Sequence, residues 1–274
     1  MIMSAEKQIE SSLFRLLQHM EQEEFKGFDP YDGLTSPLFK LPFLSSQSKL
    51  RFYAQQLVKR SPVNLRPILR IKKRLNPVTA GLAIQSYSSL FLATGKEEYR
   101  QKALVLTHQL KNLSATGYHG NCWGYDFPWE ARYATIPAYQ PTVVATGIIT
   151  NGLYESSKAF QHQEAAEMVA DAAGFVINDL NRQTEKDGSF CFSYSPFDKE
   201  MVFNASMKGA RLLSQAYAIT GNAANISTAA QAVKWVMKYQ QEDGAWIYSK
   251  RETGKWVDNY HTGYILDCLH TYIQ

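Results

Sequence analysis

The stretch that decides the fold is residues 76–113, which read NPVTAGLAIQSYSSLFLATGKEEYRQKALVLTHQLKNL. Pro77 stands where a first helix would begin, and apolar residues such as Tyr87 follow it at helical spacing. Gly95 would end that helix, and a second amphipathic helix would start at Glu97. Proline in the first turn and glycine just past the last are the expected helix boundaries. The stretch therefore predicts a pair of helices joined by a tight turn.

The same helix pair returns at Pro141 and again at Asn204. A last helix near Tyr260 has no partner after it, and a first helix over residues 4–24 has none before it. In a closed ring these two helices would pair with each other. We therefore predict an all-α fold, an α/α toroid of about five to six antiparallel helix pairs that forms one domain over residues 1–274.

Glycines recur at equivalent places in this repeat. A glycine inside a helix costs about 1 kcal/mol relative to alanine, so its recurrence predicts close packing of the first helices around a narrow axis. These helix glycines are Gly81, Gly147, Gly209 and Gly263. The second helices are followed by glycine-plus-aromatic loops, which read Gly27-Phe28, Gly120-Asn121-Cys122-Trp123, Gly188-Ser189-Phe190 and Gly244-Ala245-Trp246.

The repeat is least regular over residues 25–75. A loop rich in proline and aromatic residues covers residues 28–43, and a helix is predicted over residues 47–58. A further basic helix is predicted from Val63. This part of the chain is interpreted as a degenerate repeat unit.

The charge is mildly basic, with a formal net charge of +4 at pH 7. The basic residues concentrate in one stretch that contains Arg66, Arg70, Lys72, Lys73 and Arg74. This stretch is either a solvated helix face or a contact for an anionic glycan, a lipid head group or a membrane surface. It carries no nucleic-acid-binding motif, and no nucleic-acid partner is predicted.

The three cysteines, Cys122, Cys191 and Cys268, are an odd number and widely spaced, which fits neither a disulfide framework nor a metal site. The first ten residues lack the apolar core of a signal peptide. No run approaches the roughly 20 apolar residues of a membrane span. We therefore expect a cytoplasmic protein without a metal or cofactor.

Residues 235–246 read WVMKYQQEDGAW. This segment resembles the Q-x(2–5)-G-x-W repeat of the squalene and other triterpene cyclases, and residues 183–190 resemble a weaker copy. In that family the glutamine caps helix ends and the tryptophan packs into the neighbouring turn. The resemblance implies a toroid fold and no particular chemistry.

Residues 257–269 read VDNYHTGYILDCL, which resembles the D-x-Y-H-T-x-Y stretch of protein prenyltransferase β subunits. The resemblance places His261 at the position of a zinc ligand in that family. The family's D-x-C ligand pair corresponds to Val202-Phe203-Asn204, where neither ligand is present. The chain also has no D-x-D-D motif of the cyclases. Neither prenyltransferase zinc chemistry nor terpenoid cyclisation is therefore expected.

The chain further resembles the small toroid proteins encoded among bacterial exopolysaccharide genes (the VpsJ-type group) and, more distantly, the catalytic domain of glucuronyl C5-epimerase. This resemblance implies a glycan or a glycolipid as the small-molecule substrate. It also implies a complex with polysaccharide-synthesis enzymes as an alternative role.

Three loops rich in aromatic and charged residues would meet at the mouth of the ring, since the loops before the first helices share one end of a toroid. Aromatic faces beside carboxylates suit a sugar, because rings stack on C–H faces while carboxylates hold hydroxyls or move protons. The candidate catalytic residues are Asp126, Glu130, His261, Tyr260 and Tyr139. The candidate substrate-binding residues are Trp123, Tyr125, Trp129, Arg132, Asp29, Asp32, Asn204 and Asp258.

Each candidate also has a structural interpretation. Asp126 and Glu130 could cap a short helix or pair with Arg132, and the two aspartates around Pro30 could form an Asx turn. His261 could be a buried core histidine, although its titration near neutral pH would suit proton transfer. Trp123 fits packing better than binding.

These observations favour an acid/base enzyme of bacterial surface-polysaccharide biosynthesis, of the epimerase, lyase or hydrolase type. Arg132 would hold an anionic group of the substrate. The alternatives are an isoprenoid-binding or cyclase-like toroid and a non-catalytic scaffold in a polysaccharide-synthesis complex. The sequence alone leaves the substrate and the reaction open.

Overall fold

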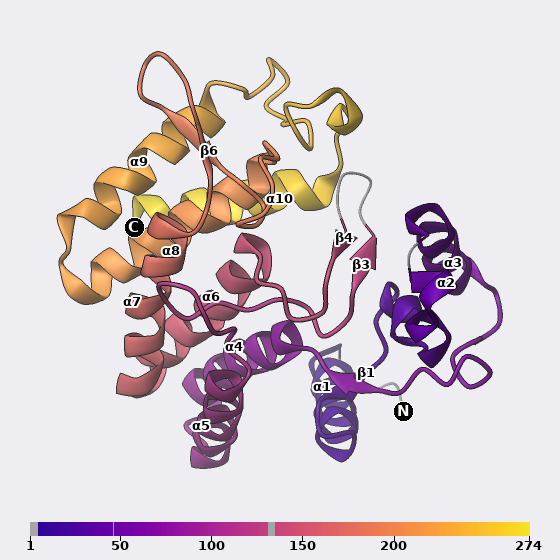
Figure 1. Cartoon of the computed structure of the whole chain (residues 1–274). Helices are drawn as coiled ribbons and strands as arrows, with labels where there is room; N and C mark the ends of the chain where they lie inside the picture. Colours follow the sequence, from indigo (N-terminus) through magenta and orange to yellow (C-terminus); the bar gives the residue numbers. More distant parts are fainter. Residues whose placement is uncertain (1–4, 46, 131–134) are drawn as a thin grey trace. The chain divides into compact units, whose positions relative to one another are not determined.

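The computed structural model describes residues 5–45, 47–130 and 135–274 (Figure 1). These residues form two compact units. Unit 1 runs up to residue 79 and includes residues 126–138, whereas unit 2 comprises residues 80–125 and 139–274. One domain over residues 1–274, closed by pairing of the first and last helices, stays a prediction.

Unit 2 is built from helix pairs, as the repeat predicts. The pairs are α4 (Pro77–Thr94, whose first turn belongs to unit 1) with α5 (Glu97–Asn112), α6 (Val143–Phe160) with α7 (Gln163–Asn178), and α8 (Phe203–Thr220) with α9 (Ala223–Met237). Residues 95–96, 161–162 and 221–222 connect the two helices of each pair, and connections this short require antiparallel helices. After η3 (Glu252–Gly254), α10 (Asn259–Ile273) packs against α8 (Figure 1). The all-α prediction is confirmed.

Side-chain caps explain where several of these helices begin. The Thr142 side chain accepts a hydrogen bond from the backbone N–H of Ala145, so α6 begins two residues after the predicted Pro141. Asn222 caps α9 in the same way, and Asp258 caps α10. Each cap satisfies an N–H group that has no partner within its helix. None of the helices in the described parts of the chain is long and apolar enough to cross a membrane.

The helix glycines allow close contact between successive first helices. A Cβ atom on Gly81 of α4 would lie 2.8 Å from the Cα atom of Ile149 on α6. A Cβ atom on Gly147 of α6 would lie 2.9 Å from the Cβ atom of Lys208 on α8. Both distances are shorter than real Cβ contacts allow, so these two glycines are required for packing. Gly263 has open space around it, and the prediction of close packing is wrong there.

The tryptophan loops lie against the ends of second helices. The indole N–H of Trp123 donates to the carbonyl of Leu110 near the end of α5, at 2.8 Å. The indole N–H of Trp246 donates to the carbonyl of Val236 near the end of α9, at 2.9 Å. Both indoles are buried, so each fills the space under its loop and satisfies a terminal helix carbonyl. The side chain of Gln240 bonds the carbonyl of Gly244 instead of a helix end.

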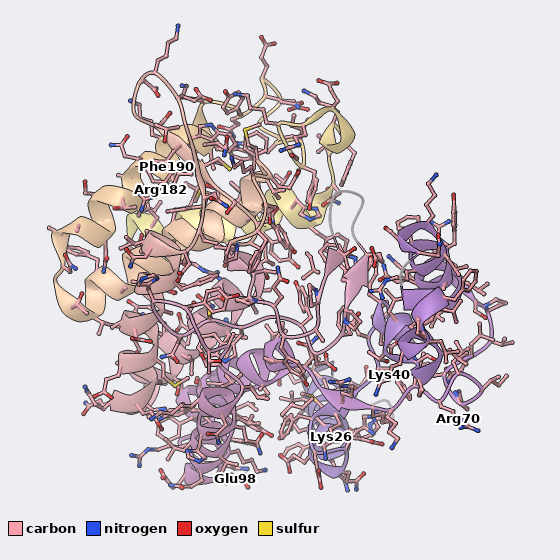
Figure 2. The ribbon with its side chains drawn as sticks, viewed as in Figure 1. Lys26, Lys40, Arg70, Glu98, Arg182 and Phe190 are labelled. Atoms are coloured by element: carbon pink, nitrogen blue, oxygen red, sulfur yellow. The ribbon has the colours of Figure 1, made fainter. Side chains whose placement is uncertain are left out.

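The third such loop contains a short antiparallel hairpin, β5 (Arg182–Thr184) with β6 (Phe190–Phe192). Here a cation replaces the tryptophan contact. The Arg182 guanidinium lies 4.9 Å from the ring centre of Phe190, and the two labelled side chains are neighbours in Figure 2. Burial lowers the pKa of Arg182.

Unit 1 is less regular. It contains α1 (Ala5–Gln22), the short helices η1 (Asp32–Thr35), η2 (Pro37–Lys40) and α2 (Pro42–Ser45), and α3 (Ser48–Arg60). Two small antiparallel strand pairs complete it, β1 (Lys26–Gly27) with β2 (Arg74–Leu75), and β3 (Trp129–Glu130) with β4 (Thr135–Ile136). Within this unit α3 packs against η1 and β3.

The basic helix predicted from Val63 is wrong. This segment forms a single turn, in which the backbone N–H of Leu69 donates to the carbonyl of Leu65. Pro67 cannot donate a helical hydrogen bond, and Arg70 adopts a left-handed backbone with φ of 53°. The local charge pattern indicated a helix, but the backbone does not form one.

Candidate active site

The beginnings of α8 and α10 lie side by side in unit 2 and run in the same direction. The Lys208 ammonium lies over the ring of Tyr264. Three residues later on each helix, Arg211 of α8 pairs with Asp267 of α10. The segment before α10 is also tied to the beginning of α8, because the backbone N–H of Phe203 donates to the carbonyl of Tyr248. These contacts bring side chains from both helices and the intervening loop into one region.

A histidine–aspartate pair forms the centre of this region. The Nδ1 atom of His261 lies 2.6 Å from Oδ2 of Asp258, and the backbone N–H of His261 donates to Oδ1 at 2.8 Å. Asp258 therefore caps α10 and orients the imidazole at the same time. Burial alone would raise the pKa of Asp258, but the hydrogen bonds from His261 and from the indole of Trp256 hold it below its ordinary value. Both side chains are 30% exposed, so the pair is open to solvent.

Aromatic rings surround the pair. The rings of Tyr248 and Trp256 stack with centroids 4.5 Å apart, and Tyr248 meets the imidazole edge-on at 4.6 Å. Tyr264 lies on the other side of the imidazole, with centroids 6.3 Å apart. Burial, reinforced by the neighbouring Tyr125, raises the pKa of Tyr248 to about 12. We call Tyr248, Trp256, Asp258, His261 and Tyr264 together the His261 site.

A stripe of buried polar residues on α8 continues from this site. The residues fall at helical spacing on one face of the helix, and they are Asn204, Lys208, Arg211 and Gln215. Asn204 was expected from the sequence, but the other three were missed. Polar residues four, seven and eleven positions after Asn204, in a helix otherwise rich in small and apolar residues, were the available signal.

Tyr248 was also missed by the sequence analysis, and its signal is a second repeat. Tyr125, Tyr194 and Tyr248 each stand two residues after the loop aromatic residue, which is Trp123, Phe192 or Trp246. The carbonyl of Tyr194 accepts from the N–H of Val143 at the start of α6, just as the carbonyl of Tyr248 accepts from Phe203 at the start of α8. The aromatic-x-Tyr pattern thus occurs in loops that hydrogen-bond to the start of a first helix, as Tyr194 and Tyr248 do.

The other predicted residues of unit 2 lie in different surroundings. Tyr260 is 76% exposed on α10, and Trp123 is fully buried beneath its loop. Tyr139 has a left-handed backbone with φ of 62°, and its N–H donates to the carbonyl of Tyr125 at 2.6 Å. The roles assigned to these three residues stay predictions.

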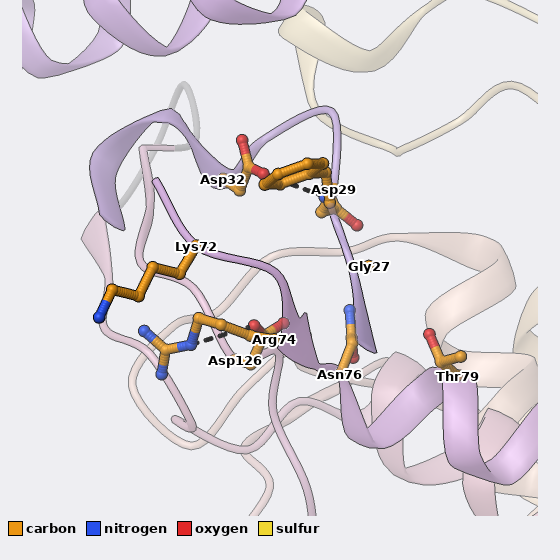
Figure 3. Close-up of a pocket in the computed structure, with 9 residues that line it drawn as sticks. Gly27, Asp29, Asp32, Lys72, Arg74, Asn76, Thr79 and Asp126 are labelled. Carbon is orange, nitrogen blue, oxygen red and sulfur yellow. Dashed lines mark hydrogen bonds and ion pairs between the residues drawn. The ribbon is translucent and has the colours of Figure 1, made fainter. Parts of the chain in front are cut away.

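Unit 1 contains a separate acidic pocket, shown in Figure 3. Its cavity volume is about 50 Å³. Asp29, Asp32 and Asp126 line it together with Lys72 and Arg74. Burial raises the pKa of Asp126 to about 6, with Asp29 and Asp32 adding to the rise and Arg74 opposing it. Arg74 lies 3.4 Å from Asp126.

Arginine also holds the other acids of this unit. Arg66 binds both carboxylate oxygens of Asp32 at 3.1 and 2.9 Å, and the Asx turn is confirmed because the N–H of Tyr31 donates to Oδ1 of Asp29 at 2.8 Å. Glu130 is buried and pairs with Arg51.

Glu130 also accepts hydrogen bonds from Ser48 and Thr135. Trp129 meets the ring of Tyr31 edge-on. Arg132 lies outside the described residues. The pairing of Glu130 with Arg132 therefore stays a prediction, and among the described residues Glu130 pairs with Arg51.

Metal binding finds no support in the part of the chain that the structure describes, where no group of three histidine, cysteine or carboxylate side chains is arranged to hold an ion. No protein-family model matches the sequence. No curated protein sequence matches it either.

Comparison with solved structures identifies the fold. The chain is similar to a cellobiose 2-epimerase from Bacillus thermoamylovorans, with a TM-score of 0.52 and 9% identity over 89% of this chain and 73% of that one. It is similar to a family 88 glycosyl hydrolase from Bacteroides vulgatus, with a TM-score of 0.54 and 11% identity over 80% and 72% of the two chains. A polysaccharide lyase gives a TM-score of 0.53 and 12% identity over 87% and 71%.

These neighbours define the class of fold, which is the α/α toroid. The prediction of an α/α toroid is confirmed.

Proposed function

We propose that this protein is a sugar-modifying enzyme that works by general acid/base catalysis at the His261 site. One observation carries the proposal. Asp258 orients an imidazole whose Nε2 atom has no hydrogen-bond partner among the described residues, and this imidazole lies beside the stacked rings of Tyr248 and Trp256. A directed base next to a flat aromatic surface is what acid/base chemistry on a sugar requires.

His261 is the proton acceptor in this proposal. Its Nδ1–H donates to Asp258, so in the neutral imidazole Nε2 carries the lone pair and faces away from the carboxylate. When Nε2 takes a proton from the substrate, the negative charge of Asp258 stabilises the imidazolium that forms. A positioned base of this kind contributes typically about 10²–10⁴-fold to the rate.

Tyr248 and Trp256 serve as the binding surface, and Tyr248 also serves as a hydrogen-bond donor. Trp256 is 42% exposed, so a sugar can reach the indole. The raised pKa of Tyr248 keeps the phenol protonated, so its hydroxyl can donate to a substrate oxygen. The hydroxyl has no hydrogen-bond partner among the described residues and is available for this purpose.

The structural neighbours support the class of the reaction. Their names describe an epimerase, a glycosyl hydrolase and a polysaccharide lyase, which are three reactions on sugars. All three move a proton to or from a sugar carbon or oxygen, so the common element is acid/base chemistry. The proposal therefore names an acid/base enzyme on sugars and leaves the bond to experiment.

The biological setting we propose is bacterial surface-polysaccharide synthesis, on the resemblance of the sequence to exopolysaccharide-cluster toroids. The substrate there would be a glycan or a glycolipid intermediate in the cytoplasm. Contact of the basic segment with an anionic surface belongs to the same proposal. Arg66, Lys73 and Arg74 already form ion pairs within unit 1, which leaves Arg70 and Lys72 as the cations outside those pairs.

The test is an NMR assay in D₂O with cellobiose, a β-linked glucuronyl disaccharide and an unsaturated glucuronyl disaccharide. We expect deuterium incorporation or bond cleavage with the native protein and loss of that reaction in His261→Ala. Tyr53→Phe is the control, because Tyr53 is 69% exposed and lies on α3 of unit 1. Full turnover by His261→Ala, or no reaction of the native protein with any of the three sugars, would overturn the proposal.

A further inference from the structure

The buried stripe on α8 contains two cations, Lys208 and Arg211, and only Arg211 pairs with a carboxylate. Arg211 has a counter-ion, since Nη1 lies 2.6 Å from Oδ2 of Asp267, and Nη2 donates to the carbonyl of Gly147 at 2.8 Å. Its Nε atom makes no hydrogen bond within the described residues. Lys208 is as deeply buried as Arg211, at 2% exposed. Its ammonium forms no hydrogen bond or ion pair with any residue in the described ranges, and its contact is the ring of Tyr264 at 4.4 Å.

An unpaired buried cation is costly, because burial removes hydration that nothing replaces. The one carboxylate close to Lys208, that of Asp267, is already bound by Arg211 and is itself mostly exposed. The remaining groups of α10 that face Lys208 are the Tyr264 ring and the Cys268 thiol. Burial, together with the Arg211 charge, lowers the pKa of Lys208 to about 8, so the ammonium form still predominates at neutral pH. Of the two buried cations on α8, Arg211 is therefore the one that holds the Asp267 carboxylate, and Lys208 has no carboxylate of its own.

Lys208 lies next to the His261 site. Tyr264, whose face covers the Lys208 ammonium, follows His261 by one turn of α10, and it is 41% exposed. Asn204 lies one turn before Lys208 on the same face of α8. Its side chain is 4% exposed and makes no hydrogen bond within the described residues, and its Oδ1 atom is fully buried.

Asn204 and Lys208 therefore offer an amide and an ammonium that have no protein partner, beside a ring that borders the imidazole. Buried polar groups in folded proteins are normally satisfied, so the unsatisfied oxygen of Asn204 beside a buried lysine without a carboxylate of its own points to a ligand. The ammonium calls for an anion, and the amide can accept a hydroxyl hydrogen or donate to an oxygen.

We infer that Lys208, with Asn204, is an anion-recognition element of the His261 site and makes it selective for sugars that carry a carboxylate or a phosphate group. This inference rests on the proposed function and names its substrate class. Lys208 is a binding residue here. The proton transfers remain with His261.

The test measures binding of glucuronic acid, glucose 6-phosphate and glucose by isothermal titration calorimetry. A charge-assisted contact predicts that the native protein binds at least one anionic sugar about tenfold or more tightly than glucose. Glucuronic acid and glucose 6-phosphate separate a carboxylate from a phosphate. Lys208→Met should lose the preference, and Lys208→Arg should keep part of it.

Lys102→Met is the matched control, because it removes a lysine that also lies over tyrosine rings, those of Tyr87 and Tyr99. It should leave the preference unchanged. Lys208→Met should fold at least as stably as the native protein, since methionine fills the same space without a buried charge. Thermal unfolding checks this point.

His261→Ala separates the inference from the proposed function, because it should abolish turnover and retain the preference for the anionic sugar. If the native protein preferred the anionic sugar but showed no turnover, Lys208 would remain a recognition residue and the proposed enzyme activity would be wrong. A native protein without an anionic preference, or Lys208→Met with the preference intact, would overturn the inference.

Discussion

The candidate sites of the two units differ in how their charged side chains are paired. In unit 1, Asp32 is held by Arg66 and Glu130 by Arg51. In unit 2, the imidazole of His261 keeps one nitrogen open and Lys208 has no counter-ion among the described residues. Charges that are paired inside a protein hold its structure together, whereas groups left without partners are available to a ligand. The comparison shifts the candidate active site from the acidic loops to the beginnings of α8 and α10.

The largest effect should come from Asp258→Asn. Asparagine caps a helix as well as aspartate does, so α10 should keep its stability. The amide cannot stabilise an imidazolium and favours the other tautomer of His261, so turnover should fall by about 10²-fold or more. Steady-state kinetics and thermal unfolding together check the prediction. A variant that lost activity and stability in proportion would mean that Asp258 is only a cap.

The next effect concerns stability in unit 1. Glu130→Ala leaves the Arg51 guanidinium without its buried partner, which should lower the free energy of unfolding by about 3 kcal/mol. Urea denaturation measures this change. Glu97→Ala is the control, because its pair with Arg100 is exposed and should change stability by less than about 1 kcal/mol. If Glu130→Ala were as stable as the native protein and inactive, the contrast between the units would fail.

The smallest effect is a pH dependence of stability from Asp126. Its pKa is raised from 3.8 to about 6, so the folded state binds the proton more tightly than the unfolded chain does. Its contribution is therefore most favourable below about pH 4 and is lost as the pH rises through about 6. Asp126→Asn should remove this decline and be more stable at pH 7 by about 1–2 kcal/mol, with Arg74 offsetting part of the gain. Urea titrations at pH 4 and pH 7 test both points. An unchanged decline in the variant would assign it to another group.

The helix pairs could be predicted from the sequence because their signals are local. Pro77, Gly95 and Asp258 act within one turn of the chain, and the structure places helix boundaries at them. The helix predicted from Val63 failed because its charge pattern was local too, while Pro67 and Arg70 decide the backbone there.

The candidate site was only half predictable for a related reason. His261 and Asp258 stand in one short motif, so both were found. Lys208 resembles a solvated lysine in the sequence, and its burial follows only from the contacts of α8 with α6 and α10. Tyr248 is held in the site by a hydrogen bond that its carbonyl accepts from the N–H of Phe203, forty-five residues earlier. Pairings over such separations depend on the whole fold, and the local patterns around these residues do not identify their partners.

The backbone hydrogen bonds from the starts of α6 and α8 to later loops have a consequence for folding cooperativity. The first amide of α6 is bonded to the loop before α8, and the first amide of α8 to the loop before α10. Neither amide has an acceptor within its own helix, so its hydrogen exchange reports opening of the following repeat. Local unfolding of the loop before α10 would thus release the start of α8, and unfolding of the loop before α8 would release the start of α6, as in a row of coupled repeats.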